Sequence, residues 1–527
     1  MRSGIKPRYD AVIIGAGHNG LVAAAYLGRA GLSVLVLERN PCIGGATQSS
    51  RPFCGVDANL SVYSYLVSLF PRKIVDDLGL DLRLKSRNIA SYTPLLDGGE
   101  LTELLVSNTS TTRTRESFLS LPGGAADYDG YLKLQELQSS LAKVLWPTLL
   151  EPLRLKTDLV AGLNRKERLA WDACIEHPIG RVIEKHISND LVRGVLFTDA
   201  KIGVSTHPHD PSLIQNLTYL YHIIGRGTGE WCVPVGGLGA LTRSLEAVAR
   251  EHGVEIASSA RVDRVHVDDR NPVVAFETGK GSRLVEARYV LCNAAPTVLD
   301  RLLGKAPAPL RAIDEGSVVK INMLLKRLPR LRSRTVSAVD AFGGTFHIDE
   351  GYDRMTENYR KAAAGRLAER PAGEMYCHSI TDNSILSDWL NEHGYHALTL
   401  FGLDMPYSVF EKDNARLRSE VLDRYLSGIN QYMDEPIQDC MAEDADGDPC
   451  IEIKSPLDLE REIHLPRGNI FHNALTWPFA EDADEAGTWG VETGFGKVFL
   501  CGSGARRGGA VSGIPGHNAA MKVLGPI

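Results

Sequence analysis

Close cysteine pairs are absent from this sequence. Its nine cysteines stand singly and no Cys-x-x-Cys pair occurs, which excludes a dithiol reductase and a zinc site held by cysteines. An odd number of cysteines in a long chain fits reduced thiols better than a disulfide framework. His207 and His209 lack a third ligand at a suitable spacing, so the sequence predicts no metal site.

Long apolar runs and basic stripes are absent as well. No uninterrupted apolar stretch reaches the roughly 18 residues that a membrane-spanning helix needs, so we expect a cytoplasmic protein, at most peripheral to a membrane. The formal net charge of -7 and the scattered basic residues give no reason to expect a nucleic-acid partner. The 527 residues exceed one typical domain, so two domains or one large composite are expected.

A glycine-rich turn stands near the start of the chain. The apolar run 9–14 predicts a buried strand, residues 21–30 predict a helix, and 34–37 predicts a second strand. Between the first strand and the helix lies Gly15-Ala16-Gly17-His18-Asn19-Gly20. In a dinucleotide site the first glycine makes the turn, the second lets the backbone approach a pyrophosphate, and the third lets helix and strand pack closely. The helix N-terminus then binds the phosphates.

An acidic residue completes the dinucleotide pattern. Glu38 ends the second strand, about 20 residues after the turn, where a carboxylate accepts hydrogen bonds from ribose hydroxyls and repels the extra phosphate of NADP. Arg39 follows, and then Gly44-Gly45-Ala46-Thr47. This second glycine pair resembles the extended motif of glutathione-reductase and amine-oxidase flavoproteins, and an NAD-only dehydrogenase does not need it.

These segments together resemble the phytoene desaturase-related FAD-dependent oxidoreductases. The branch with the mitochondrial pyridine-nucleotide-disulphide-oxidoreductase-domain proteins is the most similar. The resemblance covers the whole chain, although it is thin between 108 and 230. It is carried by residues 15–27, 231–242, 290–296, 468–472 and 499–520.

The resemblance implies a set of FAD-binding residues. It implies that the pyrophosphate binds at Gly15, Ala16, Gly17, His18, Asn19 and Gly20, and the ribose of the adenosine at Glu38. Arg39, Gly44, Gly45, Ala46 and Thr47 would line the phosphate and ribityl path, Val262 would contact the adenine, and Asn293, Ala294 and Ala295 would form a loop near the nucleotide. Gly502, Ser503 and Gly504 would contact the ribityl chain. Gly513, Ile514 and Pro515 would place a helix N-terminus at the flavin ring, where the helix dipole stabilises the charge of the reduced flavin.

Candidate catalytic residues are fewer. His472 is a candidate acid or base, and so is His517; the alternative is that both are packing residues. Arg506 and Arg507 stand where many relatives have His-Pro. Two guanidinium groups there would raise the flavin reduction potential or hold an acidic substrate, unless they face solvent or pair with carboxylates.

The predicted fold class is α/β, with a Rossmann-type FAD-binding domain and an interleaved α+β substrate domain. The FAD-binding domain is expected to comprise residues 1–108, 231–302 and 466–527, because cofactor motifs occur at the start, middle and end of the chain. The substrate domain is expected to comprise 109–230, with a helical first part, and 303–465.

The predicted activity is that of a desaturase or oxidase. With FAD as cofactor, it removes hydride from a hydrophobic or biosynthetic small molecule, and oxygen or a quinone-type acceptor reoxidises the flavin. One alternative is a ketolase or isomerase that uses flavin on a carotenoid-type substrate. Another is a non-enzymatic lipid or prenyl escort of the same fold, against which the intact C-terminal glycine loop argues.

Overall fold

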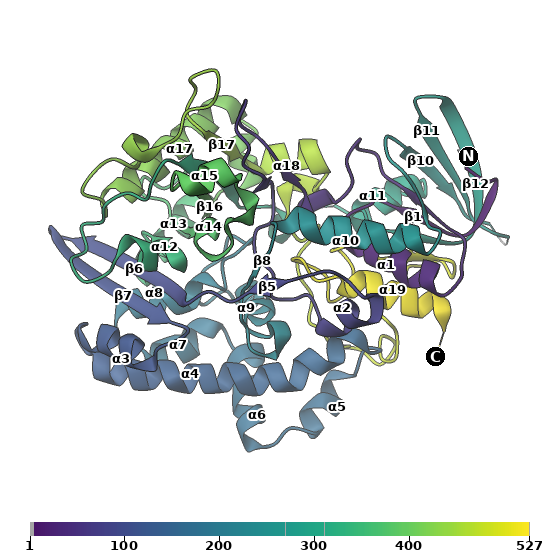
Figure 1. Cartoon of the computed structure of the whole chain (residues 1–527). Coiled ribbons are helices and arrows are strands. Elements are labelled where there is room, and N and C mark those ends of the chain that lie inside the picture. Colours follow the sequence, from purple (N-terminus) through teal and green to yellow (C-terminus); the bar gives the residue numbers. More distant parts are fainter. Residues whose placement is uncertain (1–4, 269, 310, 526–527) are drawn as a thin grey trace.

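A mainly parallel sheet organises the regions near both chain ends (Figure 1). The computed structural model describes residues 5–525 except 269 and 310, and not the side chain of Asp97. The strand order is β10-β11-β12-β1-β2-β9, with β18 also paired to β12. β18, β12, β1, β2 and β9 run parallel, and β10 and β11 add antiparallel strands to β12. The bounds are β1 (Arg8–Ile14), β2 (Val34–Leu37), β9 (Glu255–Ala257), β10 (Arg261–His266), β11 (Val273–Thr278), β12 (Gly281–Cys292) and β18 (Val498–Leu500).

Three helices pack together beside this sheet (Figure 1): α1 (His18–Arg29), α10 (Leu238–Glu251) and α19 (Ile514–Leu524). The central helix α1 is buried from His18 to Gly28, as its alanine- and leucine-rich sequence predicts. A Cβ atom at Gly516 would lie 2.0 Å from the Asn19 carbonyl oxygen. Only glycine therefore lets α19 touch the first turn of α1.

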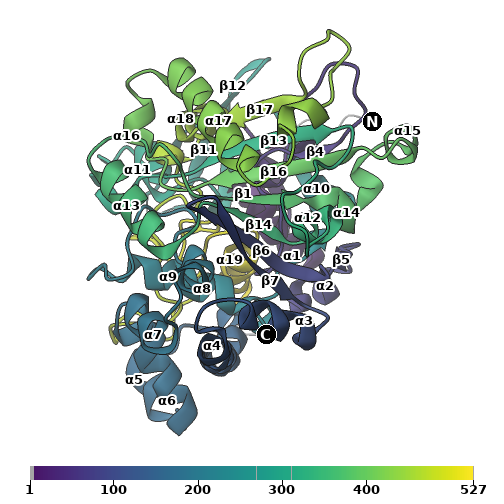
Figure 2. The same cartoon turned by 90° about the vertical axis from the view of Figure 1, so that its left-hand side faces the viewer.

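A second, mainly antiparallel sheet forms the other half of the molecule (Figure 2). Its order is β17-β13-β16-β15-β14-β6-β7, and only β14 and β6 are paired in parallel. The apolar face of α17 (Asn414–Asn430) contributes Val421, Tyr425 and Ile429 to the core on this sheet. The strand bounds are β6 (Ile89–Asp97), β7 (Glu100–Ser107), β13 (Val319–Leu325), β14 (Thr345–Ile348), β15 (Gly373–Cys377), β16 (His396–Gly402) and β17 (Ile451–Lys454).

A layer of helices lies below the second sheet in Figures 1 and 2. It consists of α3 (Thr111–Leu119), α4 (Gly124–Leu145), α5 (Lys156–Ala161), α6 (Arg165–Trp171), α7 (Ile179–His186), α8 (Asp190–Thr198) and α9 (Ile214–Ile223). Their apolar faces share one core. The other helices are α2 (Arg72–Leu78), α11 (Pro296–Leu302), α12 (Ala338–Gly343), α13 (Tyr352–Ala363), α14 (His378–Thr381), α15 (Asp388–Glu392), α16 (Tyr407–Phe410) and α18 (Pro456–Ile463). No helix in the described part of the chain is long and apolar enough to span a membrane.

The predicted strands and helices near the cofactor motifs are present, with shifted ends. β2 has the predicted bounds, and α1 begins at His18 rather than residue 21 because Gly17 is its N-cap. The five-segment domain division stays a prediction. β6 and β7 belong to the second sheet although they precede residue 108, and the segment ends 1–4 and 526–527 lie outside the described residues.

Candidate functional site

The glycine turn between β1 and α1 leaves no room for side chains. Gly15 has φ +96°, and a Cβ atom at Gly20 would lie 2.3 Å from the Gly15 carbonyl oxygen. The N-cap Gly17 supplies no side chain to the first turn of α1. Backbone N–H groups at this helix N-terminus are therefore available to an anion, as the sequence predicts for a pyrophosphate.

Two polar side chains hold the turn in place. Glu38 accepts hydrogen bonds from the backbone N–H of Ala16 at 2.7 Å and of Asn40 at 2.9 Å. The Asn293 side-chain amide donates to the Gly15 carbonyl at 3.3 Å. Because Glu38 follows β2 and Asn293 follows β12, both strands next to β1 fix its terminal loop.

The second glycine segment packs directly on the turn. The Gly44 N–H donates to the Ala16 carbonyl at 2.8 Å, and Gly44 has φ +112°. The Thr47 hydroxyl donates to the Gly44 carbonyl at 2.8 Å and contacts the Thr242 hydroxyl. Gly44 and Thr47 thus shape this segment.

The C-terminal glycine loop packs against Asn293 and the first turn of α1. A Cβ atom at Gly502 would lie 2.5 Å from the Asn293 carbonyl oxygen, and the Asn19 amide donates to the Ser503 hydroxyl at 3.4 Å. Gly513, in the left-handed region with φ +70°, is the N-cap of α19. Pro515 sits in the first turn of that helix, where proline is tolerated because no intrahelical donor is lost.

One cavity of about 930 Å³ joins these segments to the second sheet and the helical layer. Among the predicted residues, its lining includes Gly15, Gly17, His18, Asn19, Glu38, Arg39, Gly45, Ala46, Val262, Asn293, Ala294, Ala295, His472 and Ser503. The lining does not include Ala16, Gly20, Gly44, Thr47, Gly502, Gly504, Arg506, Arg507, Gly513, Ile514 or Pro515. Most of the glycines outside the lining instead make the close approaches that shape the turn and loops.

His472 and His18 face the cavity. Burial lowers the pKa of each imidazole to about 4, so both rings are neutral at pH 7. His472 Nδ1 and His18 Nε2 are buried without a hydrogen-bond partner among the described residues. His472 also has φ 71°, a backbone conformation that costs a non-glycine residue about 1–3 kcal/mol and is frequent at functional sites.

Arg506 and Arg507 lie outside the cavity, and their side chains are occupied elsewhere. Arg507 is 1% exposed and donates to the backbone carbonyls of Thr148, Glu151 and Trp489. Arg506 forms an ion pair with Glu485. The predicted roles of the two arginines in tuning the flavin or holding substrate therefore have no contact with the cavity to support them. His517, the other histidine candidate, is buried and pairs with Asn518.

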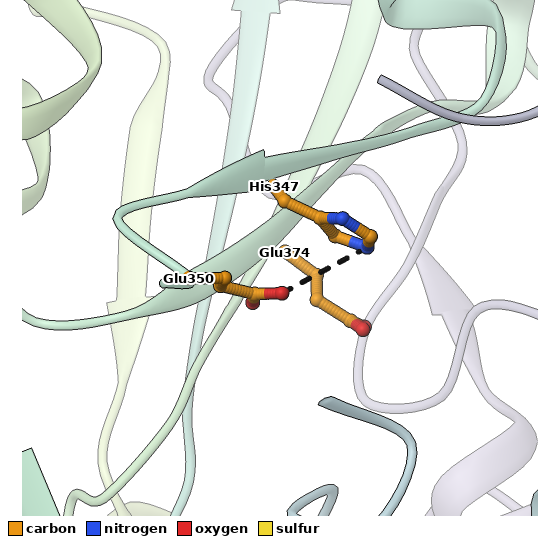
Figure 3. Close-up of side chains that lie close together, drawn as sticks. All are labelled: His347, Glu350 and Glu374. Atoms are coloured by element: carbon orange, nitrogen blue, oxygen red, sulfur yellow. Dashed lines mark ion pairs between the residues drawn. The ribbon is translucent and has the colours of Figure 1, made fainter. Parts of the chain in front are cut away.

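A buried cluster of three polar side chains, which the sequence did not predict, lies at the second sheet. His347, Glu350 and Glu374 place one nitrogen or oxygen atom each within 4.8 Å of one another (Figure 3). His347 and Glu374 line the cavity. Burial raises the pKa of Glu374 to about 7 and that of Glu350 well above its usual range. The sequence alone gives little indication of this cluster. Only His347 and Glu350 are close along the chain, and strand pairing brings Glu374 to them.

The turn and loops fit FAD. They provide a glycine cradle, the N-terminus of α1 and a carboxylate at the end of β2, the donors and acceptor that an FAD pyrophosphate and ribose require. A model of the flavin containing amine oxidoreductase family matches residues 20–350. The structure of cyclohexylamine oxidase from Brevibacterium oxydans has the same fold, with a TM-score of 0.54 at 16% identity over 98% of this chain and 99% of that one. The predicted α/β fold class is confirmed.

Three relatives extend the comparison. A limonene dehydrogenase component from Castellaniella defragrans is 47% identical over 98% of this chain and 94% of its own length. Pyridine nucleotide-disulfide oxidoreductase domain-containing protein 2 of Mus musculus is 30% identical over 99% of this chain and 94% of its own. The zeta-carotene-forming phytoene desaturase of Myxococcus xanthus is 26% identical over 64% of each chain. The predicted resemblance is confirmed: the chain belongs to the flavin containing amine oxidoreductases, and it is an FAD-dependent enzyme.

Proposed function

We propose that this enzyme removes a hydride from a carbon–hydrogen bond of a hydrophobic small molecule, as a dehydrogenase or desaturase. The observation that carries the proposal is the apolar wall of the cavity beyond the glycine turn. That wall includes Val195, Leu196, Ile202, Ile223, Val318 and Phe401. An apolar surface of this kind favours a hydrophobic substrate, because moving apolar surface out of water into the pocket lowers the free energy. The name of the limonene dehydrogenase relative supports the same substrate class.

The cofactor would be held by the segments already described. The N-terminus of α1 at Gly17 would bind the pyrophosphate, Glu38 the ribose and Val262 the adenine. The N-terminus of α19, beginning at Ile514, would face the flavin ring, and its dipole would stabilise negative charge there. When bound, FAD supplies a two-electron acceptor for hydride.

A proton must leave the substrate with the hydride so that a double bond forms. We propose His472 as the acceptor, because the residue belongs to the cavity lining and its ring is neutral. Its low pKa makes it a weak base, which suits a substrate cation that loses its proton readily. We propose oxygen or a quinone-type molecule as the acceptor that reoxidises the flavin.

Anaerobic titration tests the activity. The yellow holoenzyme is mixed with monoterpenes, carotenoid precursors and, for comparison, primary amines, and the flavin absorbance near 450 nm is followed. Bleaching by a hydrocarbon, with a product two mass units lighter, supports the proposal. Bleaching by amines alone contradicts it.

A cavity-filling variant shows where the substrate binds. Val195→Trp places bulk on α8 at the apolar wall, so we expect normal FAD content with loss of bleaching by the hydrocarbon. Leu284→Trp, at a side chain that is 70% exposed, is the matched control and should behave as the wild type.

A further inference from the structure

The register of the second sheet brings together a nitrogen donor and two carboxylates. His347 on β14 and Glu374 on β15 are directly opposite in the antiparallel pair, so their side chains project from the same face. Glu350 follows the end of β14, and Figure 3 shows its carboxylate pointing to the His347 ring. The three candidate ligand atoms lie within 4.8 Å of one another.

The Glu350 carboxylate is buried and makes no hydrogen bond within the described chain. The residue is 1% exposed, and neither carboxylate oxygen has a hydrogen-bond partner among the described residues. Glu374, 4% exposed, is better satisfied, because Thr198 and Tyr376 donate to it. An ionised carboxylate that is buried without a partner costs several kcal/mol, so the group must take up either a proton or a cation.

The nearby cations form no ion pair with the cluster in the described chain. Lys201 pairs with Asp404 at 2.9 Å and donates to the Thr206 carbonyl. Arg87 donates to the Thr345 hydroxyl. Neither side chain makes a hydrogen bond or ion pair with Glu350 in the described chain, although the charge of Arg87 acts on Glu374 and on His347.

The spacing of the cluster favours an ion over a shared proton. His347 Nε2 and Glu350 Oε2 are 3.8 Å apart, too far for a hydrogen bond. Ligands bound to one metal ion at about 2.0–2.2 Å are held apart from one another by roughly 3–4 Å. The gap between the side chains therefore has the dimension of a bridging ion.

We propose that His347, Glu350 and Glu374 bind one divalent transition-metal ion, such as zinc or manganese. An imidazole nitrogen with two carboxylates is a donor set of this class rather than the all-oxygen set preferred by calcium or magnesium. His347 Nδ1 is hydrogen-bonded to the Thr93 hydroxyl at 2.7 Å, which orients the ring and leaves Nε2 for the metal. Because His347 and Glu374 line the cavity, a further coordination position is open to water or a ligand.

Metal analysis of the FAD-loaded protein tests the site. After chelator treatment and desalting, zinc chloride or manganese chloride is added, and bound metal is counted by mass spectrometry. We expect one ion per chain, a higher melting temperature with metal, and an unchanged flavin spectrum. Failure of either metal to bind, with the FAD content intact, overturns this proposal without affecting the proposed hydride transfer.

Three variants locate the ion. Glu350→Gln keeps the size of the side chain and replaces one carboxylate oxygen by an amide nitrogen, so it should fold and yet lose metal binding by at least about 100-fold. Thr93→Val should weaken binding by about 10–100-fold, because it removes the orienting partner of His347. Asp199→Asn removes an acidic group from the same cavity but no ligand of the cluster, so it should keep the stoichiometry of one. Equal loss in Asp199→Asn and Glu350→Gln would indicate a diffuse charge effect and overturn the site.

Discussion

The Glu38 carboxylate accepts a hydrogen bond from the Ala16 backbone N–H at 2.7 Å, which joins the end of β2 to the glycine turn after β1. Its other oxygen accepts from the Asn40 N–H. One side chain therefore shapes the turn, and we propose that it also binds the ribose.

Glu38→Gln should weaken FAD binding about tenfold or more. The amide replaces one of two acceptors by a donor that faces a backbone N–H, and a lost charge-assisted hydrogen bond is worth about 1.5–3 kcal/mol. Titration of the apoprotein with FAD measures the dissociation constant. Glu277→Gln, at an exposed ion pair with Arg261, is the control, and equal constants for both variants would remove Glu38 from the site.

Gly20→Ala should yield protein with little or no flavin. The added Cβ would lie 2.3 Å from the Gly15 carbonyl oxygen, so the turn must open and the pyrophosphate cradle is lost. The absorbance ratio at 450 and 280 nm reports FAD content. Gly279→Ala, where nothing lies within 4 Å of the new Cβ, should stay yellow; a yellow Gly20→Ala protein would contradict the assignment.

Arg507→Met should destabilise the fold by about 2–4 kcal/mol and leave the flavin reduction potential unchanged. The substitution removes a buried guanidinium and leaves three carbonyls, those of Thr148, Glu151 and Trp489, short of a donor. Urea unfolding and potentiometry separate the two effects. A shifted potential in a stable protein would return Arg507 to the role that the sequence suggested.

Lys320→Met should stabilise the protein most at low pH. Burial lowers the pKa of Lys320 to about 7, whereas an unfolded lysine keeps its proton up to about pH 10.4. Between these values the unfolded state binds more protons, so the wild-type free energy of unfolding rises with pH, by at most about 1.4 kcal/mol per unit. The advantage of Lys320→Met should therefore shrink from pH 6 to pH 9.5.

Urea unfolding at the two pH values measures this advantage. Lys280→Met, at an exposed position, controls for the general loss of a positive charge. A gain for Lys320→Met that does not depend on pH would contradict the expected titration.

Much of the cofactor region could be predicted from the sequence, because its determinants are local. The strand, turn, helix and acid occupy residues 8–38, and the backbone conformation of glycine and the apolar burial of α1 act within that span. The roles of Gly44 and Gly513 were predicted from the resemblance to flavoproteins, and their contacts with the cofactor stay proposals.

Other features depend on the tertiary structure alone. Arg506 and Arg507 lie beside the cofactor loop in sequence, yet Arg507 bonds to the carbonyl of Thr148, which lies 359 residues away. The backbone of Arg507 lies in the left-handed region at φ 64°. This conformation of the loop directs the Arg507 side chain to Thr148 rather than to the cavity.

The sequence by itself predicted a dinucleotide site at the β1–α1 turn, since every residue of that motif is close to the next along the backbone. Only the tertiary structure decided that His347 opposes Glu374 and that Glu350 closes the cluster. Strand register sets such contacts, and register depends on the packing of whole sheets rather than on neighbouring residues.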